Sequence, residues 1–301
     1  MMKHLINKGM RLGWILIVFL GFTGCYDQAA EVDLPTYNKR TVITSYLSPK
    51  DQNITVELTY TLPYFGKQVA DVPRVGDAKV VVSDMTVGKS VQLPFDSSIM
   101  LYRIRAFALP IVNDHEYRID VIMKDGTVHW SKTRIPPALK EADLKVGKFV
   151  VGKLEASNWG GQSVSASLEM IAENTQTGFF YSPQFEMVLE DGNGDFYGSM
   201  LYFPNDGIEA GKSGDALRYL FNDRIYIDQF SGGSAALDPL ILKEVVGTFW
   251  VMDEGYKERY MREMQISDNP FAEPILMFSN WSNGAIGALG AYDWVEAVIT
   301  P

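Results

Sequence analysis

Residues 191–195 form the segment whose residue types and spacing could hold a metal ion. Asp191-Gly192-Asn193-Gly194-Asp195 places side-chain oxygens at alternate positions, and such oxygens can converge on one calcium ion. The pattern then departs from a calcium loop, because Phe196 stands where a glycine is needed and Tyr202 where a bidentate glutamate is needed. A glycine-rich hairpin explains the same residues. The residues to test for calcium are Asp191, Asn193 and Asp195.

No motif in the sequence indicates a catalytic nucleophile, and no cofactor is expected. Gly211-Lys212-Ser213 ends like a phosphate-binding loop, but Asp206 occupies the position of the first glycine. His115 and His129 have no cysteine, histidine or paired carboxylate at metal-ligand spacing, so we interpret both as structural or surface residues. No Gly-x-Ser-x-Gly elbow occurs, and no carboxylate pair stands out among 37 acidic residues. We therefore expect a protein that is not an enzyme.

Aromatic side chains near glycine-rich turns are the remaining candidates for ligand binding. A protein that holds sugars or peptides outside the cell would do so by ring stacking and apolar contact. The candidates are Trp159, Tyr181, Phe196, Tyr197, Tyr202 and Phe203. Core packing is the alternative, because 12% aromatic residues needs no special cause in a β-rich protein.

The first 25 residues have the layout of a secretion signal followed by a cysteine. Three cations and no acid precede an apolar run over residues 12–20, which is shorter than the roughly 20 residues of a membrane-spanning helix. Gly21-Phe22-Thr23-Gly24-Cys25 resembles the lipobox of bacterial lipoproteins, in which small residues precede a cysteine that receives a diacylglycerol. We expect a signal peptide over 1–24 and a lipid anchor on Cys25, the only cysteine in the chain. The alternative is a free cysteine after an ordinary signal-peptidase site.

Residues 25–38 are acidic and polar, which favours a flexible tether between the lipid and the body. They also resemble the acidic segments that direct lipoproteins to the cell surface in the Bacteroidota. Removal of residues 1–24 takes away three of 27 cations and none of 37 acids, so the net charge moves from −10 to −13. This balance disfavours nucleic acid and anionic membrane surfaces as partners. A lone cysteine also excludes an internal disulfide, so stability must come from the core.

Residues 39–137 read as β-strands separated by turns. The strands are rich in β-branched and aromatic residues, and several alternate polar with apolar residues. Their expected positions are 41–47, 54–60, 78–82, 101–104 and 117–122. Clusters of Gly, Pro, Asn and Asp between them are typical of turns. The spacing predicts an immunoglobulin-like or transthyretin-like β-sandwich.

Ile135-Pro136-Pro137-Ala138 interrupts regular structure, because two prolines remove two backbone donors. We place a domain boundary there and expect a second β-rich domain over residues 138–301. Its expected strands are at 163–170, 179–181, 184–189, 224–227 and 245–252. Residues 254–264 predict a helix, because four apolar side chains fall on one face, and a second short helix is expected at 212–220. The fold class is therefore mostly β, with one or two short helices.

The stretch from Asp268 to Tyr292 is the most distinctive in the chain. It holds Asn269-Pro270-Phe271, Pro274, Ser279-Asn280, and glycines at 284, 287 and 290 before a final strand. This order resembles the closing signature of a Bacteroidota outer-membrane lipoprotein family, the domain-of-unknown-function family 4249. The N-terminal half resembles the same family at residues 42–47, 76–82, 117–121 and 125–126. Glycines at three-residue intervals suit tight turns or the close approach of another backbone.

The resemblance implies an accessory lipoprotein associated with a TonB-dependent outer-membrane receptor, and it implies no catalytic residues. The leading hypothesis is a non-enzymatic, lipid-anchored partner of a TonB-dependent transporter that captures a small oligomeric nutrient on the extracellular face of the outer membrane. One alternative is a structural or assembly component of an outer-membrane complex. A surface hydrolase is the third hypothesis, and it would need an acid pair, or a nucleophile with a base, in one pocket.

Overall fold

The computed structural model describes residues 38–62, 73–156, 162–190, 196–201, 208–227, 241–265 and 278–299. Lys39–Pro63 and Gln68–Pro301 form one compact unit, which contains every helix and strand that the structure describes. The expected signal peptide, Cys25 and most of the tether lie outside the described residues. Where the structure is described, no helix is both long and apolar enough to cross a membrane.

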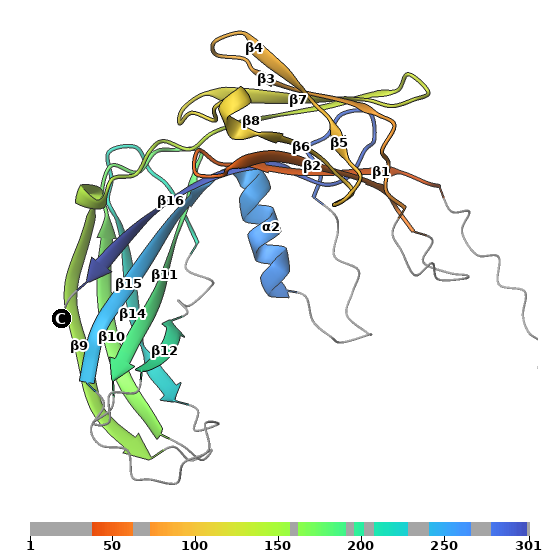
Figure 1. Ribbon diagram of the computed structural model, residues 1–301. Coiled ribbons are helices and arrows are strands. Elements are labelled where there is room, and N and C mark those ends of the chain that lie inside the picture. Colours follow the sequence, from red (N-terminus) through yellow and green to blue (C-terminus); the bar gives the residue numbers. More distant parts are fainter. Residues whose placement is uncertain are drawn as a thin grey trace, which may run out of the picture. The chain divides into compact units, whose positions relative to one another are not determined.

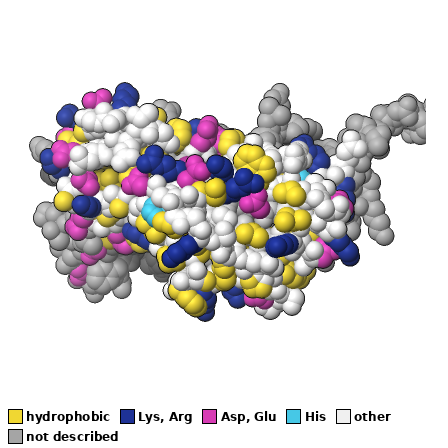
Figure 2. All heavy atoms as spheres, turned by 90° about the horizontal axis from the view of Figure 1, so that it is seen from above, with side chains coloured by type: hydrophobic (Ala, Val, Ile, Leu, Met, Phe, Trp, Pro, Cys, Tyr) yellow, Lys and Arg dark blue, Asp and Glu magenta, His cyan; other side chains and the backbone are white. Residues whose placement is uncertain are grey.

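The first half of the unit is a β-sandwich, as the sequence predicts (Figure 1). One layer has the strand order β4-β3-β7-β8, with β3 at Lys79–Asp84, β4 at Lys89–Leu93, β7 at Glu116–Ile122 and β8 at Val128–Arg134. The other layer contains β1 at Thr41–Leu47, β2 at Asn53–Tyr60, β5 at Phe95–Asp96 and β6 at Leu101–Arg105. Figure 2 looks onto the side of the four-stranded layer and shows acidic and basic side chains interspersed there.

Alternation along the strands explains why the two layers pack together. Successive side chains of a strand point to opposite faces, so every second residue of β1 and β2 faces the four-stranded layer. These residues and their counterparts on β3 and β7 form one buried apolar core, which includes Ile43, Leu47, Ile54, Val56, Leu58, Val80, Val82, Tyr117, Ile119 and Val121. Most of the remaining side chains of β1 and β2 are only partly buried on the other face.

The second half of the unit extends the same sheet and adds a second one. The large sheet has the order β12-β11-β15-β16-β1-β2-β6-β5, with β13 also paired to β11. Its later strands are β11 at Phe180–Glu190, β12 at Phe196–Leu201, β13 at Glu209–Ala210, β15 at Ile241–Met252 and β16 at Leu289–Ile299. The added sheet has the order β14-β10-β9, with β9 at Leu144–Ala156, β10 at Gln162–Ala172 and β14 at Leu217–Ile227.

The last strand, β16, joins the two halves. It runs antiparallel to β15 and parallel to β1, where Ser45 pairs with Leu289 and Leu47 with Ala291. Leu289 and Ala291 are buried in the sandwich core, together with Trp281. Residues from β16, late in the chain, therefore share the sandwich core with residues from β1, early in the chain. Residues 135–140 have neither helix nor strand, and the boundary at residue 137 stays a prediction.

The predicted helix at 254–264 is confirmed as α2, Glu254–Gln265. Asp253 caps it, because its carboxylate accepts a hydrogen bond from the Tyr256 N–H at 2.8 Å. The same carboxylate oxygen accepts a bond from the Ala291 N–H at 2.9 Å, so one side chain ties the helix start to β16. Two 3₁₀ turns, Ala106–Ala108 and Glu141–Asp143, complete the helical elements among the described residues.

Two of the C-terminal glycines allow the close backbone approach that their spacing predicts. A Cβ on Gly287, whose φ is +108°, would collide with the carbonyl oxygen of Ile43 on β1. A Cβ on Gly290 would collide with the backbone nitrogen of Tyr256 on α2. Helix α2 consequently lies directly on β16, with backbone against backbone.

Two expectations about the second half are wrong. The short helix expected at 212–220 is a turn followed by β14, because Leu217, Tyr219 and Phe221 alternate into a second core with a period of two. The strands expected at 179–181 and 184–189 are one strand, β11, which continues through Pro183. Pro183 lies between the residues of β11 that pair with β13 and those that pair with β12, where a strand tolerates a missing amide hydrogen.

Candidate functional site

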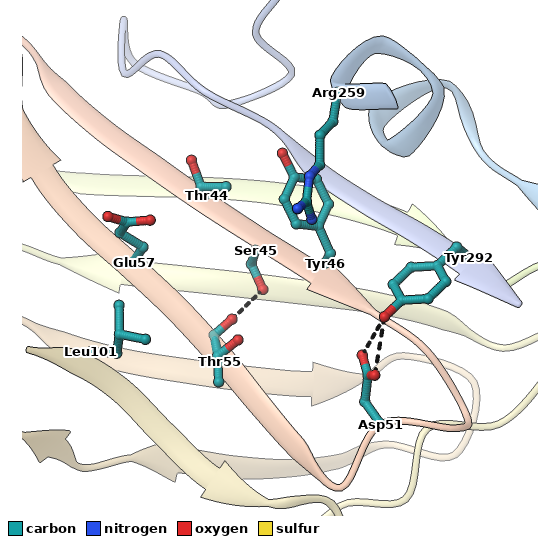
Figure 3. Close-up of a pocket in the computed structure, with 9 residues that line it drawn as sticks. All are labelled: Thr44, Ser45, Tyr46, Asp51, Thr55, Glu57, Leu101, Arg259 and Tyr292. Carbon is teal, nitrogen blue, oxygen red and sulfur yellow. Dashed lines mark hydrogen bonds between the residues drawn. The ribbon is translucent and has the colours of Figure 1, made fainter. Parts of the chain in front are cut away.

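A cleft of about 450 Å³ lies on the face of β1 and β2 that points away from the sandwich core (Figure 3). Strand β1 supplies three consecutive residues, β2 supplies two alternate ones, and β6 supplies Leu101. The turn after β1 supplies Asp51, β16 supplies Tyr292, and α2 supplies Arg259. The lining residues are Thr44, Ser45, Tyr46, Asp51, Thr55, Glu57, Leu101, Arg259 and Tyr292. The volume is in the range of small-molecule sites.

Asp51 and Tyr292 form the hydrogen-bonded end of the cleft. The Tyr292 hydroxyl donates to both carboxylate oxygens of Asp51, at 3.0 Å each. Burial raises the pKa of Asp51 above its ordinary value of 3.8, although the bond from Tyr292 acts in the opposite direction. Burial and the neighbouring carboxylate also raise the pKa of Tyr292. The tyrosine is therefore a fixed donor, and Asp51 keeps acceptor capacity for a further partner.

The turn that carries Asp51 is tied to β16 by the residue before it. Lys50 donates from its ammonium group to the backbone oxygen of Trp294 and lies 4.1 Å from the centre of the Trp294 ring. The ammonium group is also 3.7 Å from the Asp293 carboxylate. These contacts hold the turn against a strand more than 240 residues away in sequence. They position the carboxylate of Asp51 relative to Tyr292.

Two aromatic rings, Tyr46 and Tyr292, line the cleft and belong to a larger cluster of rings. The Tyr292 ring stacks on the Tyr256 ring at a centroid distance of 4.3 Å, and Tyr46 meets Tyr256 edge-on at 5.4 Å. Trp250 on β15 extends the cluster, 6.3 Å from Tyr256. The guanidinium carbon of Arg259 lies 4.5 Å from the centre of the Tyr46 ring, a cation–π contact. The cluster therefore fixes both the rings and the cation at the mouth of the cleft.

The opposite side of the cleft is mostly polar. Glu57 lines it and forms an ion pair with Arg74. The Ser45 hydroxyl donates to the backbone oxygen of Thr55 at 2.8 Å. Leu101 adds apolar surface beside Glu57 (Figure 3). The cleft thus combines carboxylates, hydroxyls, a guanidinium group and aromatic rings, which suits binding of a polar ligand that also has an apolar surface.

A second cleft, of about 360 Å³, lies beside β8 and the start of α2. Its two cations already have partners, since Lys132 pairs with Glu116 and Arg134 with Asp114, each at 2.9 Å. The Asp253 carboxylate in this cleft is engaged by the helix cap. The first cleft is the larger of the two and has two tyrosine rings beside its charged groups, so we take it as the candidate site.

Among the residues that the sequence suggested for binding, Tyr181 is described in full and is not part of the cleft lining. Tyr181 is fully buried, so its prediction as an exposed ligand aromatic is wrong. Its hydroxyl accepts a bond from the Gln176 N–H at 2.8 Å, and its ring contacts Phe249 in the second core. Phe196 and Tyr197 are described only by their backbone pairing in β12, with Glu190 and Leu189. Outside the described residues lie Trp159, Tyr202, Phe203, Asp191, Asn193 and Asp195.

The two histidines within the described residues, His115 and His129, have structural partners. His115 Nδ1 lies 2.8 Å from the buried carboxylate of Asp84, at the end of β3. His129 is buried on β8, with Nδ1 at 3.2 Å from the backbone oxygen of Ser282. In the parts of the chain that the structure describes, no group of three or more potential metal ligands comes together.

Sequence reasoning missed the residues of the cleft, although two signals pointed to them. Tyr46 sits on β1 at a position that alternates out of phase with the apolar Ile43 and Leu47, so it falls on the polar face. Tyr256 and Arg259 are three residues apart on α2, and therefore on one side of the helix. No local pattern singles out Asp51, because an aspartate in a turn is ordinary.

Comparisons with known proteins place the chain in a family. The family model "Domain of unknown function (DUF4249)" matches residues 28–227, which is more than half of the chain. Among curated proteins, none matches the sequence significantly.

Comparison with solved structures adds little to the family assignment. The chain is similar to the crystal structure of the C-terminal globular domain of oligosaccharyltransferase from Pyrococcus abyssi, with 9% identity and a TM-score of 0.14. The match covers 89% of this chain and 52% of that one, so it spans about half of that structure's length. A TM-score this low carries no argument about fold or function. On the strength of the family model, the chain belongs to the DUF4249 family.

Proposed function

We propose that the protein is a ligand-capture lipoprotein of the outer membrane, exposed on the extracellular face, that works with a TonB-dependent transporter in nutrient uptake. The observation that carries the proposal is the cleft on β1 and β2, where carboxylates, hydroxyls, Arg259 and tyrosine rings converge. Such a mixture of apolar and polar groups in one concave site is typical of small-molecule binding.

Features outside the cleft support the proposed location at the outer membrane and the proposed partner. The lipobox-like segment ending at Cys25 supports a lipid anchor, and the acidic residues 25–38 support a tether long enough to hold the body off the membrane. The family resemblance supports the association with a TonB-dependent receptor. Binding without catalysis fits the absence of a nucleophile motif in the sequence.

A pull-down of the full chain tests the partner. The protein, tagged at its C-terminus and expressed at its native level, is extracted in mild detergent, and co-purified proteins are identified by mass spectrometry. Near-equal recovery of a TonB-dependent receptor is the expected result. Recovery with outer-membrane assembly machinery would favour the structural or assembly alternative, and recovery alone would favour an independent surface binder. Either of these outcomes overturns the proposed partnership.

The lipid anchor has its own test. Cys25→Ala removes the thiol that would carry the lipid, and more than one acyl chain is what anchors a protein stably to a membrane. We expect the variant to leave the membrane fraction almost completely, as measured by fractionation and immunoblotting. Cys25→Ala recovered in the membrane fraction at the wild-type level would contradict the anchor.

Hydrolysis is a second candidate function, favoured by one observation. Two carboxylates, Asp51 and Glu57, line the same cleft, and an acid pair is what a surface hydrolase needs. Both already have partners, Tyr292 and Arg74, which is why we rank binding first. Incubation of the purified protein with candidate ligands, followed by product analysis, decides between them. Products that disappear with Asp51→Asn would establish the hydrolase.

A further inference from the structure

We infer that the cleft lined by Asp51, Glu57, Tyr46, Tyr292 and Arg259 binds a neutral carbohydrate, a short stretch of an oligosaccharide. The inference rests on the proposed ligand-capture function and names the chemical class of the ligand. Four properties of the cleft lead to it: its charge balance, its hydrogen-bonding groups, its aromatic wall and the state of the strands that form its floor.

Charge balance argues for a neutral ligand. Asp51 and Glu57 supply two carboxylates, Arg259 lines the same cleft, and Arg74 pairs with Glu57. Arg74 lies outside the lining and offsets the charge of Glu57, so one acid of the lining, Asp51, stands against one guanidinium group, that of Arg259. A strongly anionic ligand would meet the carboxylates and a cationic ligand the guanidinium groups, at the short distances where charges act strongly. Neither sign of ligand is favoured overall.

Hydrogen-bonding groups of both kinds line the cleft. A carboxylate only accepts hydrogen bonds, and a guanidinium group only donates them. A sugar hydroxyl does both, so it can donate to Asp51 or Glu57 while it accepts from Arg259. Bonds of this kind to charged groups are stronger than those between neutral groups. The hydroxyl groups of Thr44 and Thr55, between these charged residues, can serve either role.

The aromatic wall supplies the apolar part of the site. Tyr46 and Tyr292 line the cleft, and both rings are held in place by contacts with Tyr256. A sugar ring presents C–H groups on its faces and hydroxyls around its edge, which matches a site with rings beside charged groups. Packing of that apolar face on a fixed ring gains burial at small entropic cost. Leu101 offers further apolar contact across the cleft.

The strands beneath the cleft argue against a peptide bound as an added strand. β1 is paired on both sides, with β2 and β16, and β2 is paired on both sides, with β1 and β6. Peptides recognised by strand addition need an open sheet edge. At this cleft the ligand must be held by side chains, as a carbohydrate is.

A glycan-binding assay with matched variants tests the inference. The detergent-solubilised full chain is applied to an array of neutral gluco-, manno-, galacto- and xylo-oligosaccharides, with sialylated glycans, sulfated glycans and short peptides as comparators. We expect binding to a neutral glycan, weakened about tenfold or more by Glu57→Gln and by Tyr46→Ala, because each removes a contact of about 1.4 kcal/mol or more. Trp130→Ala is the control, since this exposed aromatic residue lies on β8 and is not part of the cleft lining.

Several outcomes would overturn the inference. They are absence of binding to every neutral glycan, binding restricted to sialylated glycans, sulfated glycans or peptides, and binding that Trp130→Ala weakens as much as the cleft variants do. If Tyr46→Ala fails to fold, Glu57→Gln, on a partly exposed side chain, keeps the test open. The pull-down is independent of this assay. A recovered transporter without glycan binding defeats the carbohydrate inference alone, and glycan binding without a transporter defeats the proposed partnership alone.

Discussion

The two faces of strands β1 and β2 have opposite characters. One face supplies Ile43, Ile54 and Leu58 to the sandwich core, where each is at most 1% exposed. The other face supplies Thr44, Thr55 and Glu57 to the candidate cleft. Because strand side chains alternate, residues adjacent in sequence serve these different purposes.

This contrast indicates where a site can be placed on a β-sandwich. The core face needs complementary apolar shapes from the facing layer, so its composition is restricted. The cleft face is covered in part by α2 and its rings, which leaves room for charged groups beside apolar ones (Figure 3). Packing in the core therefore holds β1 and β2 in place. Their other face can carry different types of side chain without disturbing that packing.

The largest expected effect is a loss of stability at Leu58 on the core face, compared with a small loss at the neighbouring Glu57 on the cleft face. Leu58→Ala leaves a cavity in the core and should lower the free energy of unfolding by about 2–5 kcal/mol. Glu57→Gln should lower it by less than about 1 kcal/mol, because its ion pair with Arg74 is partly exposed. Urea unfolding followed by circular dichroism measures both. Equal losses in the two variants would contradict the distinction between the faces.

A smaller effect is expected where α2 meets β16. Gly290→Ala places a Cβ against the backbone nitrogen of Tyr256, so the helix must shift away from the strand. Overpacking of this kind costs about 1–3 kcal/mol. Because Tyr256 and Arg259 move with the helix, ligand binding should weaken as well. Unfolding and binding titrations test this, and a variant that unfolds and binds as the wild type does would show that the cleft does not depend on this contact.

The pH dependence of stability should differ in sign between Asp51 in the cleft and Asp84 in the four-stranded layer. Burial raises the pKa of Asp51, so its folded form binds protons more tightly and its contribution to stability falls as pH rises above 3.8. Burial would also raise the pKa of Asp84, but hydrogen bonds from His115 and the backbone of Val87 and Thr86 lower it overall. The contribution of Asp84 is present above pH 3.8 and is lost as pH falls.

Single amide variants separate the two contributions. As pH rises above 3.8, Asp51→Asn should become more stable relative to the wild type. Over the same rise in pH, Asp84→Asn should become less stable relative to the wild type. Chemical unfolding at a series of acidic to neutral pH values gives both difference curves. Curves that slope in the same direction would mean that the two carboxyl groups have similar environments.

The smallest effect is expected on the outer face of the four-stranded layer (Figure 2). Arg118 forms an ion pair with Asp120 at 2.6 Å and lies 4.7 Å from the centre of the Trp130 ring. Ion pairs that solvent still reaches contribute little, so Arg118→Ala should change stability by about 1 kcal/mol or less and leave glycan binding unchanged. A loss comparable to that of Gly290→Ala would show that this face also bears on the cleft.

Much of the fold follows from local patterns. Thr41–Leu47 alternates clearly enough to give β1 with its observed ends, and the apolar face of residues 254–264 gives α2. Local patterns are insufficient at residues 212–220, where a lysine-glycine turn precedes a strand, and at Tyr181, whose exposure no local rule decides. Pairing with distant strands settles both cases.

Strand and helix periodicities and the resemblance to the family can be read from the amino-acid sequence, because each depends on residues close together in the chain. The spacing of the glycines at 287 and 290 suggests a close approach of another backbone, but only the tertiary structure identifies that backbone as Ile43 and Tyr256. The cleft, in contrast, exists only through tertiary contacts. Asp51 and Tyr292 are 241 positions apart and meet because β16 pairs with β1 in parallel, and Arg259 reaches Tyr46 because α2 packs on β16. Such contacts depend on long-range pairing, whose energy is spread over many residues along the chain.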